Sequence, residues 1–474
     1  MGRMLTTKAL QPPANRPAAS VPNKAPGLAV PGRPVAPEAP LNSPKQVRSG
    51  NLAFYCGLVL VFTSFGVLTE ALYFITGRNT YVIYVVSPAA ILGALWSGGM
   101  LRTLQSRATW YWVGFSLWML VSIPFSFWTG GSVNEFYNYV RVSLPLLFVV
   151  GGLATNWKEL RTVFNTIAMA GLLSLLTTRW FGVEENGRVN LSANGSSIGN
   201  SNDLASHLII ILPFLLFVAM DRKRNPIVRF SMVLLMGYGA SVILGTASRG
   251  GVIALSAVFL FVLLCAKMSQ RILAVAIAGL LVAASFVLLP SATLNRLASL
   301  FGQENIEADQ SKDARDYLFK TSVRYSLQHP IFGVGLGQFP NFEGSESRAK
   351  GEHGNWHATH CTWTEVSSEC GIPALVFFVL AIGSAFFLVF RVWRQTRKRG
   401  LTELSNACFC YLIAMVGFLV DITFLANAYR FYLPAMIGLA ISISFVAKQQ
   451  LAARTTSKDQ RFASMIPPQP LAIR

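Results

Sequence analysis

Long apolar runs, each almost free of charge, constrain the fold of this chain more than any other feature. Of its 474 residues, 53% are hydrophobic and 13% are charged, whereas a soluble domain carries about 25% charged residues. Because about 20 consecutive apolar residues cross a bilayer as a helix, the runs predict a polytopic membrane protein. The net charge of +19 would favour nucleic acid as the partner of a soluble protein. Here the bases lie in short connections between apolar runs, so they indicate membrane topology and no nucleic-acid partner.

The apolar runs predict an all-α fold with about twelve transmembrane helices. With the N-terminus in the cytoplasm, the basic connections fall on the cytoplasmic side, and the short outer connections 77–78, 129–138 and 427–429 contain only one base, Arg78. The positive-inside rule therefore predicts a multi-pass protein of the inner (plasma) membrane with both termini in the cytoplasm. The expected spans lie near residues 52–76, 79–98, 109–128, 139–155, 160–178, 203–220, 230–247, 251–266, 271–290, 371–390, 405–426 and 430–447.

Three regions follow from this pattern. Residues 1–50 are rich in proline and contain no apolar stretch of a signal peptide, so we expect a disordered cytoplasmic tail. Residues 51–448 form the transmembrane domain, and residues 449–474 form a cytoplasmic C-terminal tail. The connection 291–370 is a large, polar and partly helical loop on the outer face. Connections of such length are usually functional, so we expect the site there.

An arginine stands at the outer end of one expected helix, in Ser248-Arg249-Gly250-Gly251. At membrane depth an arginine costs about 2.5–3.5 kcal/mol on insertion scales, so it tends to have a partner or a task. The glycines beside it expose backbone N–H groups that suit an anion. The alternative is an arginine that only extends its side chain to the membrane interface. Arg249 is thus a candidate anion-binding residue.

The large loop contains a helix followed by a glycine-rich turn. A helix is expected from Asp313 to about Gln328, and Pro330 interrupts it. The glycines of the run 333–337 then predict a turn in which backbone segments approach closely. This run is similar to a phosphate-binding loop, but it neither follows a strand nor opens a helix, so the likeness alone is weak.

Two histidines and two glutamates precede the tenth expected span. His357 and His360 are three residues apart, and Glu365 and Glu369 follow them. These four could ligate a metal ion, but no further cluster of histidines or cysteines completes the set. An acid–base role is favoured, since histidine titrates near neutral pH and can take a proton from a hydroxyl. On a continuous helix Glu369 would face away from His360, so it is expected to hold the helix in place.

Together and in this order, these motifs resemble the O-antigen ligase and polymerase superfamily of bacterial envelope glycosyltransferases. The family has a Ser-Arg-Gly-type element at a helix end, as in residues 248–250. It has an arginine some fifteen residues before a His-Pro-x-x-Gly-x-Gly turn, and Arg315 precedes Pro330 by that spacing. A His-Asn-x-Tyr-like element and a Glu-x-Gly follow, matched here at His360 and Glu369. The resemblance covers the membrane region from about residue 185 to 445.

The match is not complete at every position. Cys361 replaces the asparagine that follows the histidine in the family, and the extra His357 leaves open which histidine is catalytic. Asn202 matches an asparagine that the family places before an apolar helix, and Arg188 is a weaker candidate for the diphosphate. The resemblance thus implies His360, Arg315 and Arg249 as catalytic residues, and Arg188, Asn202, His357 and Glu369 as substrate-binding residues.

The resemblance also implies a reaction. The donor is a glycan on undecaprenyl diphosphate at the outer leaflet, and the acceptor is lipid A-core or a growing glycan. Arg249 and Arg315 would clamp the diphosphate, which removes the need for a metal ion or other cofactor, and His360 would orient or deprotonate the acceptor hydroxyl. Direct displacement would invert the anomeric carbon. Lipopolysaccharide or exopolysaccharide synthesis is the expected pathway, with membrane lipid around the chain and polysaccharide-assembly proteins as candidate partners of the N-terminal tail.

Two other classes of function compete with a transferase. A transporter or flippase of a lipid-linked or anionic substrate would use the same arginines as binding charges, with broken helices and a site near the bilayer midplane. A structural membrane subunit would not need two arginines and a histidine on the outer face. The polar groups gather at the outer face rather than at mid-membrane, which favours an enzyme. The motifs do not separate a ligase from a polymerase.

Overall fold

The computed structural model describes residues 51–191, 198–266, 291–298 and 306–465, with scattered residues between 268 and 283. The chain divides into Met1–Gln46 and a compact unit, Val47–Arg474, and the described residues all belong to the second unit. The expected N-terminal tail and most of the expected span 271–290 lie outside the described residues, as do residues 466–474.

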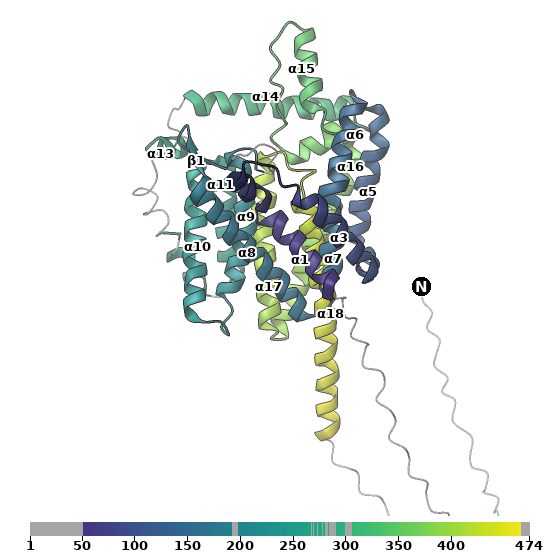
Figure 1. The fold of residues 1–474 in the computed structure, drawn as a ribbon, viewed down its shortest axis with the longest axis vertical. Helices are drawn as coiled ribbons and strands as arrows, with labels where there is room; N and C mark the ends of the chain where they lie inside the picture. The colour runs from purple at the N-terminus through teal and green to yellow at the C-terminus, as the bar shows by residue number, and fades with distance from the viewer. Residues whose placement is uncertain are drawn as a thin grey trace, which may run out of the picture. The chain divides into compact units, whose positions relative to one another are not determined.

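Almost all described elements are helices (Figure 1). The bundle contains α1 (Asn51–Phe65), α2 (Leu68–Thr76), α3 (Val82–Trp96), α4 (Gly99–Leu104), α5 (Arg107–Ser122), α6 (Thr129–Asn138), α7 (Leu144–Leu153), α8 (Trp157–Phe181), α9 (Ser201–Ala219), α10 (Pro226–Gly245), α11 (Arg249–Cys265), α16 (Thr362–Lys398), α17 (Thr402–Asp421) and α18 (Tyr432–Met465). The other elements are the hairpin β1 (Val183–Glu185) and β2 (Arg188–Asn190), the helices α13 (Ser291–Ala298), α14 (Ile306–Gln328) and α15 (Phe339–Ala349), the short 3₁₀-helices η1 (Ile123–Phe125) and η4 (Ile422–Phe424), and the short π-helix η2 (Tyr139–Ser143).

The helices confirm an all-α polytopic membrane protein. Seven described helices are long and apolar enough to cross a membrane, and there are eight spans if the bent pair α1–α2 counts as one. Two further apolar helices, α3 and α11, are shorter than this test requires. The total of about twelve spans stays a prediction.

Burial separates central helices from peripheral ones. In the most apolar 18-residue window of each span, 89% of the residues are buried in α9, 72% are buried in the span of α17 and η4, and only 22% are buried in α10. A helix that is apolar on all sides can pack inside a bundle or face lipid. Here α9 and α17 form the centre, while α10 leaves most of its surface for the membrane.

The segment expected as the outer connection 129–138 is helical instead. It forms α6, and the apolar helix continues through η2 and α7 as one candidate span, Thr129–Leu153. Its glycines and polar residues are poor helix formers, but contacts with the distant glycine-rich turn compensate. The Ser132 hydroxyl donates to the Leu336 carbonyl at 2.9 Å, and Gly131 packs against the side chains of Trp128 and Gln338.

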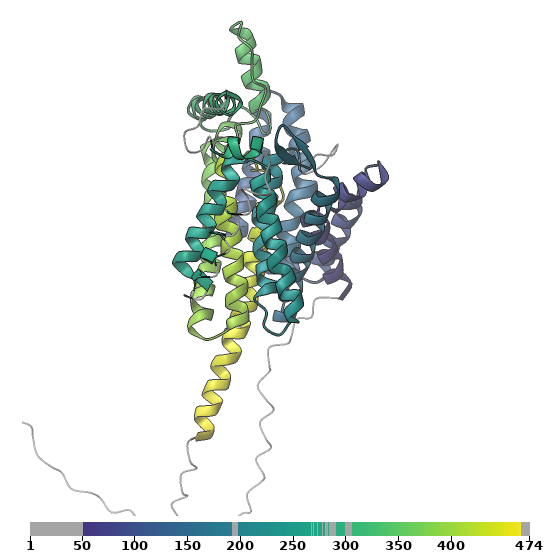
Figure 2. The ribbon, with the colours of Figure 1, turned by 90° about the vertical axis from the view of Figure 1, so that its left-hand side faces the viewer.

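One end of the bundle is covered by the large loop. Helix α14 runs across the ends of the bundle helices, and α15 projects beyond it (Figures 1 and 2). Helix α14 ends at Gln328, as expected before Pro330, but it begins at Ile306 rather than at Asp313. We call this end of the bundle the α14 end. Helices α11 and α16 both begin there, so their N-terminal turns point toward the loop.

Candidate functional site

The glycine-rich turn after α14 is bonded to the start of α16 through backbone groups. The N–H of Val334 donates to the Ser368 carbonyl at 2.8 Å, and the N–H of Gly335 donates to the Glu369 carbonyl at 2.9 Å. In the other direction, the N–H of Ile372 donates to the Pro330 carbonyl at 2.8 Å. The turn and the helix therefore form one unit.

The carboxylate of Glu369 completes this junction. It accepts the N–H of Gly337 at 2.8 Å and the N–H of Phe339 at 3.2 Å, and the side chain is buried. The segment from Val334 to Phe339 thus donates four backbone N–H groups to α16, and two of these bonds go to the Glu369 carboxylate. This use of the amides supports a positioning role for Glu369, and it does not extend the likeness to a phosphate-binding loop.

Two glycines allow the backbone of the turn to approach the backbone of α16 closely. Gly371 has φ 85° and ψ 171°, which interrupts α16, and a Cβ there would lie 2.0 Å from the Ile331 carbonyl oxygen. Gly333 has φ 69°, and a Cβ there would lie 2.3 Å from the Glu369 carbonyl carbon. Positive φ and backbone contact both exclude a side chain at these positions.

His360 lies immediately before α16, and the charge of Arg315 in α14 acts on its side chain. It precedes the N-cap residue Cys361 and has φ 54°, so helical periodicity does not relate its direction to that of Glu369. Burial, then the charge of Arg315, then that of His357 lower the pKa of His360 from 6.5 to about 4. The imidazole is therefore neutral at pH 7, and its lone pair is available to a proton.

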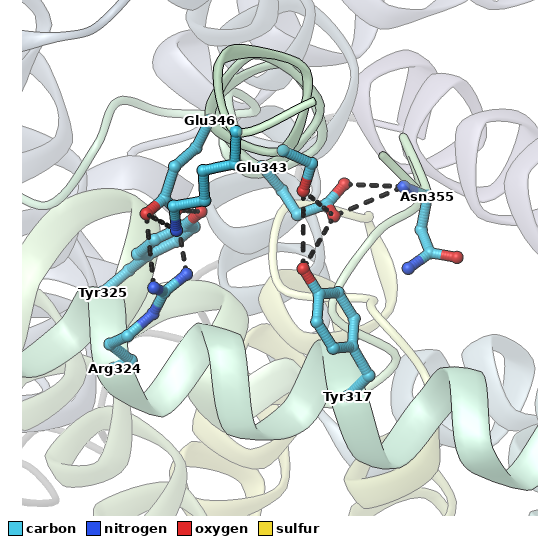
Figure 3. A network of polar contacts seen from close by, with 8 residues as sticks. Tyr317, Arg324, Tyr325, Glu343, Glu346 and Asn355 are labelled. Atoms are coloured by element: carbon cyan, nitrogen blue, oxygen red, sulfur yellow. Dashed lines mark hydrogen bonds and ion pairs between the residues drawn. The ribbon is translucent and has the colours of Figure 1, made fainter. Parts of the chain in front are cut away.

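The loop that carries both histidines is held by a buried glutamate, Glu343 of α15 (Figure 3). Its carboxylate accepts the N–H groups of Asn355 and Trp356, each at 3.0 Å, and the Ser347 hydroxyl at 3.1 Å. The Glu343 side chain has no solvent exposure. The sequence analysis missed Glu343, and no local pattern marks it, because its backbone partners stand twelve and thirteen residues further along the chain.

A second carboxylate joins α15 to α14 (Figure 3). Glu346 accepts two bonds from Arg324, at 2.8 and 3.2 Å, one from Lys350 at 2.7 Å, and one from the Tyr325 hydroxyl. These bonds connect α15, and with it the histidine loop, to the helix that carries Arg315.

Arg188 joins three separate parts of the chain. It follows the Asn186–Gly187 turn of the hairpin, where both residues have positive φ, 51° and 67°, as two-residue hairpin turns require. Its Nε donates to the Thr246 carbonyl at 2.9 Å, and its Nη2 donates to the Asn202 side-chain oxygen at 2.8 Å. The structure thus brings Arg188 and Asn202 together, beside the connection that leads to Arg249.

Arg249 is the first residue of α11. Ser248 caps this helix, and its hydroxyl accepts the Gly251 N–H at 3.3 Å, which confirms the helix end expected from the sequence. Gly250 lies against Phe424, with 3.0 Å from a Cβ position to that side chain. The Arg249 side chain is half-buried at the positive end of the helix dipole, where an anion is stabilised.

Arg430 is a further arginine that the sequence analysis did not select. Its Nη2 lies 3.4 Å from a carboxylate oxygen of Asp203, in the first turn of α9. It also interacts with the charge of Glu135 in α6. The signal in the sequence was a base at the end of a span where the positive-inside rule expects few bases.

The candidate residues form two groups at the α14 end. One contains Arg315, His357 and His360, and the other contains Arg188, Asn202 and the start of α11 with Arg249. Across the described ranges, no group of three or more His, Cys, Asp or Glu side chains is arranged to hold a metal ion. The metal interpretation of the two histidines therefore gains no support.

The comparison with known families matches the part of the chain that holds most of these residues. Residues 232–379 match the O-antigen ligase family, from α10 through Arg249 and the large loop into α16. A comparison with curated proteins gives no significant match. The matched range contains Arg249, Arg315, His360 and Glu369, and this part of the chain is similar to the O-antigen ligase family.

Proposed function

We propose that this protein transfers a glycan from undecaprenyl diphosphate to an acceptor hydroxyl at the outer face of the bacterial inner membrane. The O-antigen ligase match supports a transferase of the ligase or polymerase type. The acceptor is lipid A-core in a ligase and a lipid-linked glycan in a polymerase. The proposed topology has both termini in the cytoplasm and the α14 end outside, as the charges of the short connections predict.

The observation that carries this proposal is the pairing of Arg315 with a neutral His360. The two are 45 positions apart in the sequence, and burial first, then the charge of Arg315, lowers the pKa of His360. This charge interaction supports the proposed roles, in which Arg315 supplies a cation for the leaving group and His360 supplies a base for the acceptor. Glu343 and Glu346 connect the loop that carries His360 to the helix that carries Arg315.

In the proposed step, the acceptor oxygen forms a bond to the anomeric carbon while the bond from that carbon to the diphosphate oxygen breaks. His360 takes the proton of the hydroxyl, and undecaprenyl diphosphate leaves with the electron pair. Arg249 and Arg315 stabilise the negative charge that develops on the departing phosphate. Attack from the side opposite the leaving group inverts the anomeric configuration.

A transporter is the second candidate, because it would also have a broken helix. Helix α16 is broken at Gly371. The break lies nine residues after the start of the helix at Thr362, toward the α14 end, and the protein fills it with its own Ile331 and Pro330 carbonyls. A break closed in this way does not open a substrate path at mid-membrane.

The test is glycan transfer by the purified protein in detergent, with EDTA, from an undecaprenyl-diphosphate oligosaccharide. Labelled lipid A-core would identify a ligase, and longer lipid-linked chains would identify a polymerase. Donor binding without transfer to either acceptor would favour the transporter. If EDTA abolished transfer and a divalent cation restored it, the arginine clamp would be insufficient.

Variants separate the chemistry from folding. Arg249→Ala, Arg315→Ala and His360→Ala should each abolish or strongly reduce transfer, the histidine variant by about 10²–10⁴-fold. The matched control is Arg348→Ala, which removes an exposed arginine of α15 on the same loop. Full activity of Arg315→Ala would refute the diphosphate clamp.

A further inference from the structure

A large cavity lies at the end of the bundle opposite α14. Its volume is about 1040 Å³, and it is lined by the start of α8, the α9–α10 connection, the end of α11 and the α16–α17 connection. Helix α11 starts at the α14 end, and its 17 residues carry the chain about 25 Å to Cys265 at the cavity. The bases in these connections predict that this end faces the cytoplasm.

The walls of the cavity are apolar and aromatic. Trp393 and Phe409 stack with ring centroids 6.0 Å apart, and Trp157 packs edge-on against Phe217. Tryptophans at the ends of membrane helices are typical of the boundary between lipid and water. The exposed Phe230 adds a further apolar surface. These walls suit hydrocarbon rather than a soluble ligand.

The rim of the cavity carries an excess of positive charge. The acids are Asp221, which pairs with Arg161, and Glu403, which pairs with Lys223 at 2.7 Å. Each lining acid is thus matched by a base. The lining also contains Arg222, Arg229 and Arg397, and none of the ion pairs between described residues includes these three.

Two of these arginines also cap helices, which leaves most of their donors for a ligand. The Nε of Arg229 donates to Ala219, the last residue of α9, at 2.9 Å, and Nη1 of Arg397 donates to Cys265, the last residue of α11, at 3.1 Å. A cap explains why an arginine is at each position. A guanidinium has five N–H donors, and each cap uses one of them.

We propose that this cavity binds an anionic glycerophospholipid of the inner leaflet. The phosphodiester lies against Arg229 and Arg397, and the acyl chains lie along the aromatic walls. Basic pockets between membrane helices on the cytoplasmic side are the usual sites for anionic lipid headgroups. The combination of unmatched positive charge and apolar walls selects a lipid over a free phosphate, because only a lipid fills both parts. The site is separate from the proposed transfer site.

The first test measures lipid binding to the full-length chain in detergent by native mass spectrometry. Phosphatidylglycerol should bind, and phosphatidylcholine should bind much more weakly. Arg397→Gln should weaken phosphatidylglycerol binding about tenfold, the size expected for the loss of one charge-assisted contact. The matched control, Arg348→Gln, loses the same charge on the exposed α15 and should bind as the wild type does. Equal binding of both lipids, or equal loss in both variants, would overturn the proposal.

A second test uses the wild-type chain, so it does not depend on folding of a variant. Cys265 lines the cavity, and its modification by a maleimide can be followed by peptide mass spectrometry. Phosphatidylglycerol should slow this modification, while inorganic phosphate should not. Protection by phosphate alone would indicate a site for a soluble anion. A modification rate that phosphatidylglycerol does not change would mean that this lipid leaves Cys265 uncovered, and either result would contradict the lipid site.

Discussion

Replacing Glu369 tests whether this residue positions the site or contacts the substrate. In Glu369→Ala, the N–H groups of Gly337 and Phe339 lose their acceptor in a buried position. Each buried donor left without a partner costs about 1–3 kcal/mol, so the loss in the free energy of unfolding should be about 2–6 kcal/mol. Glu369→Gln keeps one acceptor oxygen and should lose about half as much.

The assay is thermal unfolding in detergent, followed by tryptophan fluorescence. One of the ten tryptophans, Trp118, lies at the junction itself, where its indole N–H donates to the Cys370 carbonyl at 3.1 Å. The unfolding temperature should fall in the order wild type, Gln, Ala. Glu352→Ala serves as the control, since it removes an exposed acid from the same loop.

Transfer activity separates the two roles of Glu369. A positioning residue should lower stability and activity together, and Glu369→Gln should recover part of both. If both variants unfolded at the wild-type temperature but bound the donor poorly, Glu369 would contact the substrate, and our reasoning from the backbone bonds would be refuted.

Three further changes address the loop and the histidines. His357→Gln should move the acid limb of the pH–rate profile of transfer slightly to higher pH, because burial and the charge of Arg315, the larger causes of the lowered pKa of His360, both remain; a shift to lower pH would assign that limb to another group. Arg315→Lys should restore little of the transfer lost in Arg315→Ala, since a point charge does not replace a bidentate guanidinium, and full recovery would exclude bidentate binding. Gly371→Ala should destabilise the protein by more than the roughly 1–3 kcal/mol of backbone strain, because its Cβ would also meet the Ile331 carbonyl at 2.0 Å; a wild-type unfolding temperature would contradict the close contact.

The sequence predicted the parts of the fold that depend on local pattern. The apolar runs predicted a helical membrane protein, and Pro330 predicted where α14 ends. The helical state of 129–138 was not predictable in this way, because it depends on the contact of Ser132 with Leu336, 204 positions away.

The sequence predicted which residue types form the candidate site, but not the hydrogen bonds that hold its loops in place. Sequence motifs selected Arg249, Arg315 and His360, whose catalytic roles stay predictions. The partners of Glu343 and Glu369 are backbone amides, which leave no mark on the sequence. Any residue supplies a backbone amide, so the pattern of side chains does not reveal which carboxylate holds which loop.

The contact between Gly333 and the backbone at Glu369, with its counterpart at Gly371, has a consequence for engineering acceptor choice. The backbone of the turn packs directly against the backbone of the first part of α16. A loop taken from another transferase would therefore have to pack against a helix to which it is not complementary. A chimera should therefore exchange residues 306–372 as one block, from the start of α14 past Gly371, so that Glu346 also keeps its partners Arg324 and Tyr325. Chimeras cut between Gly337 and Thr362 would separate Glu369 from the amides it holds and should fail to fold, whatever glycan their new loop recognises.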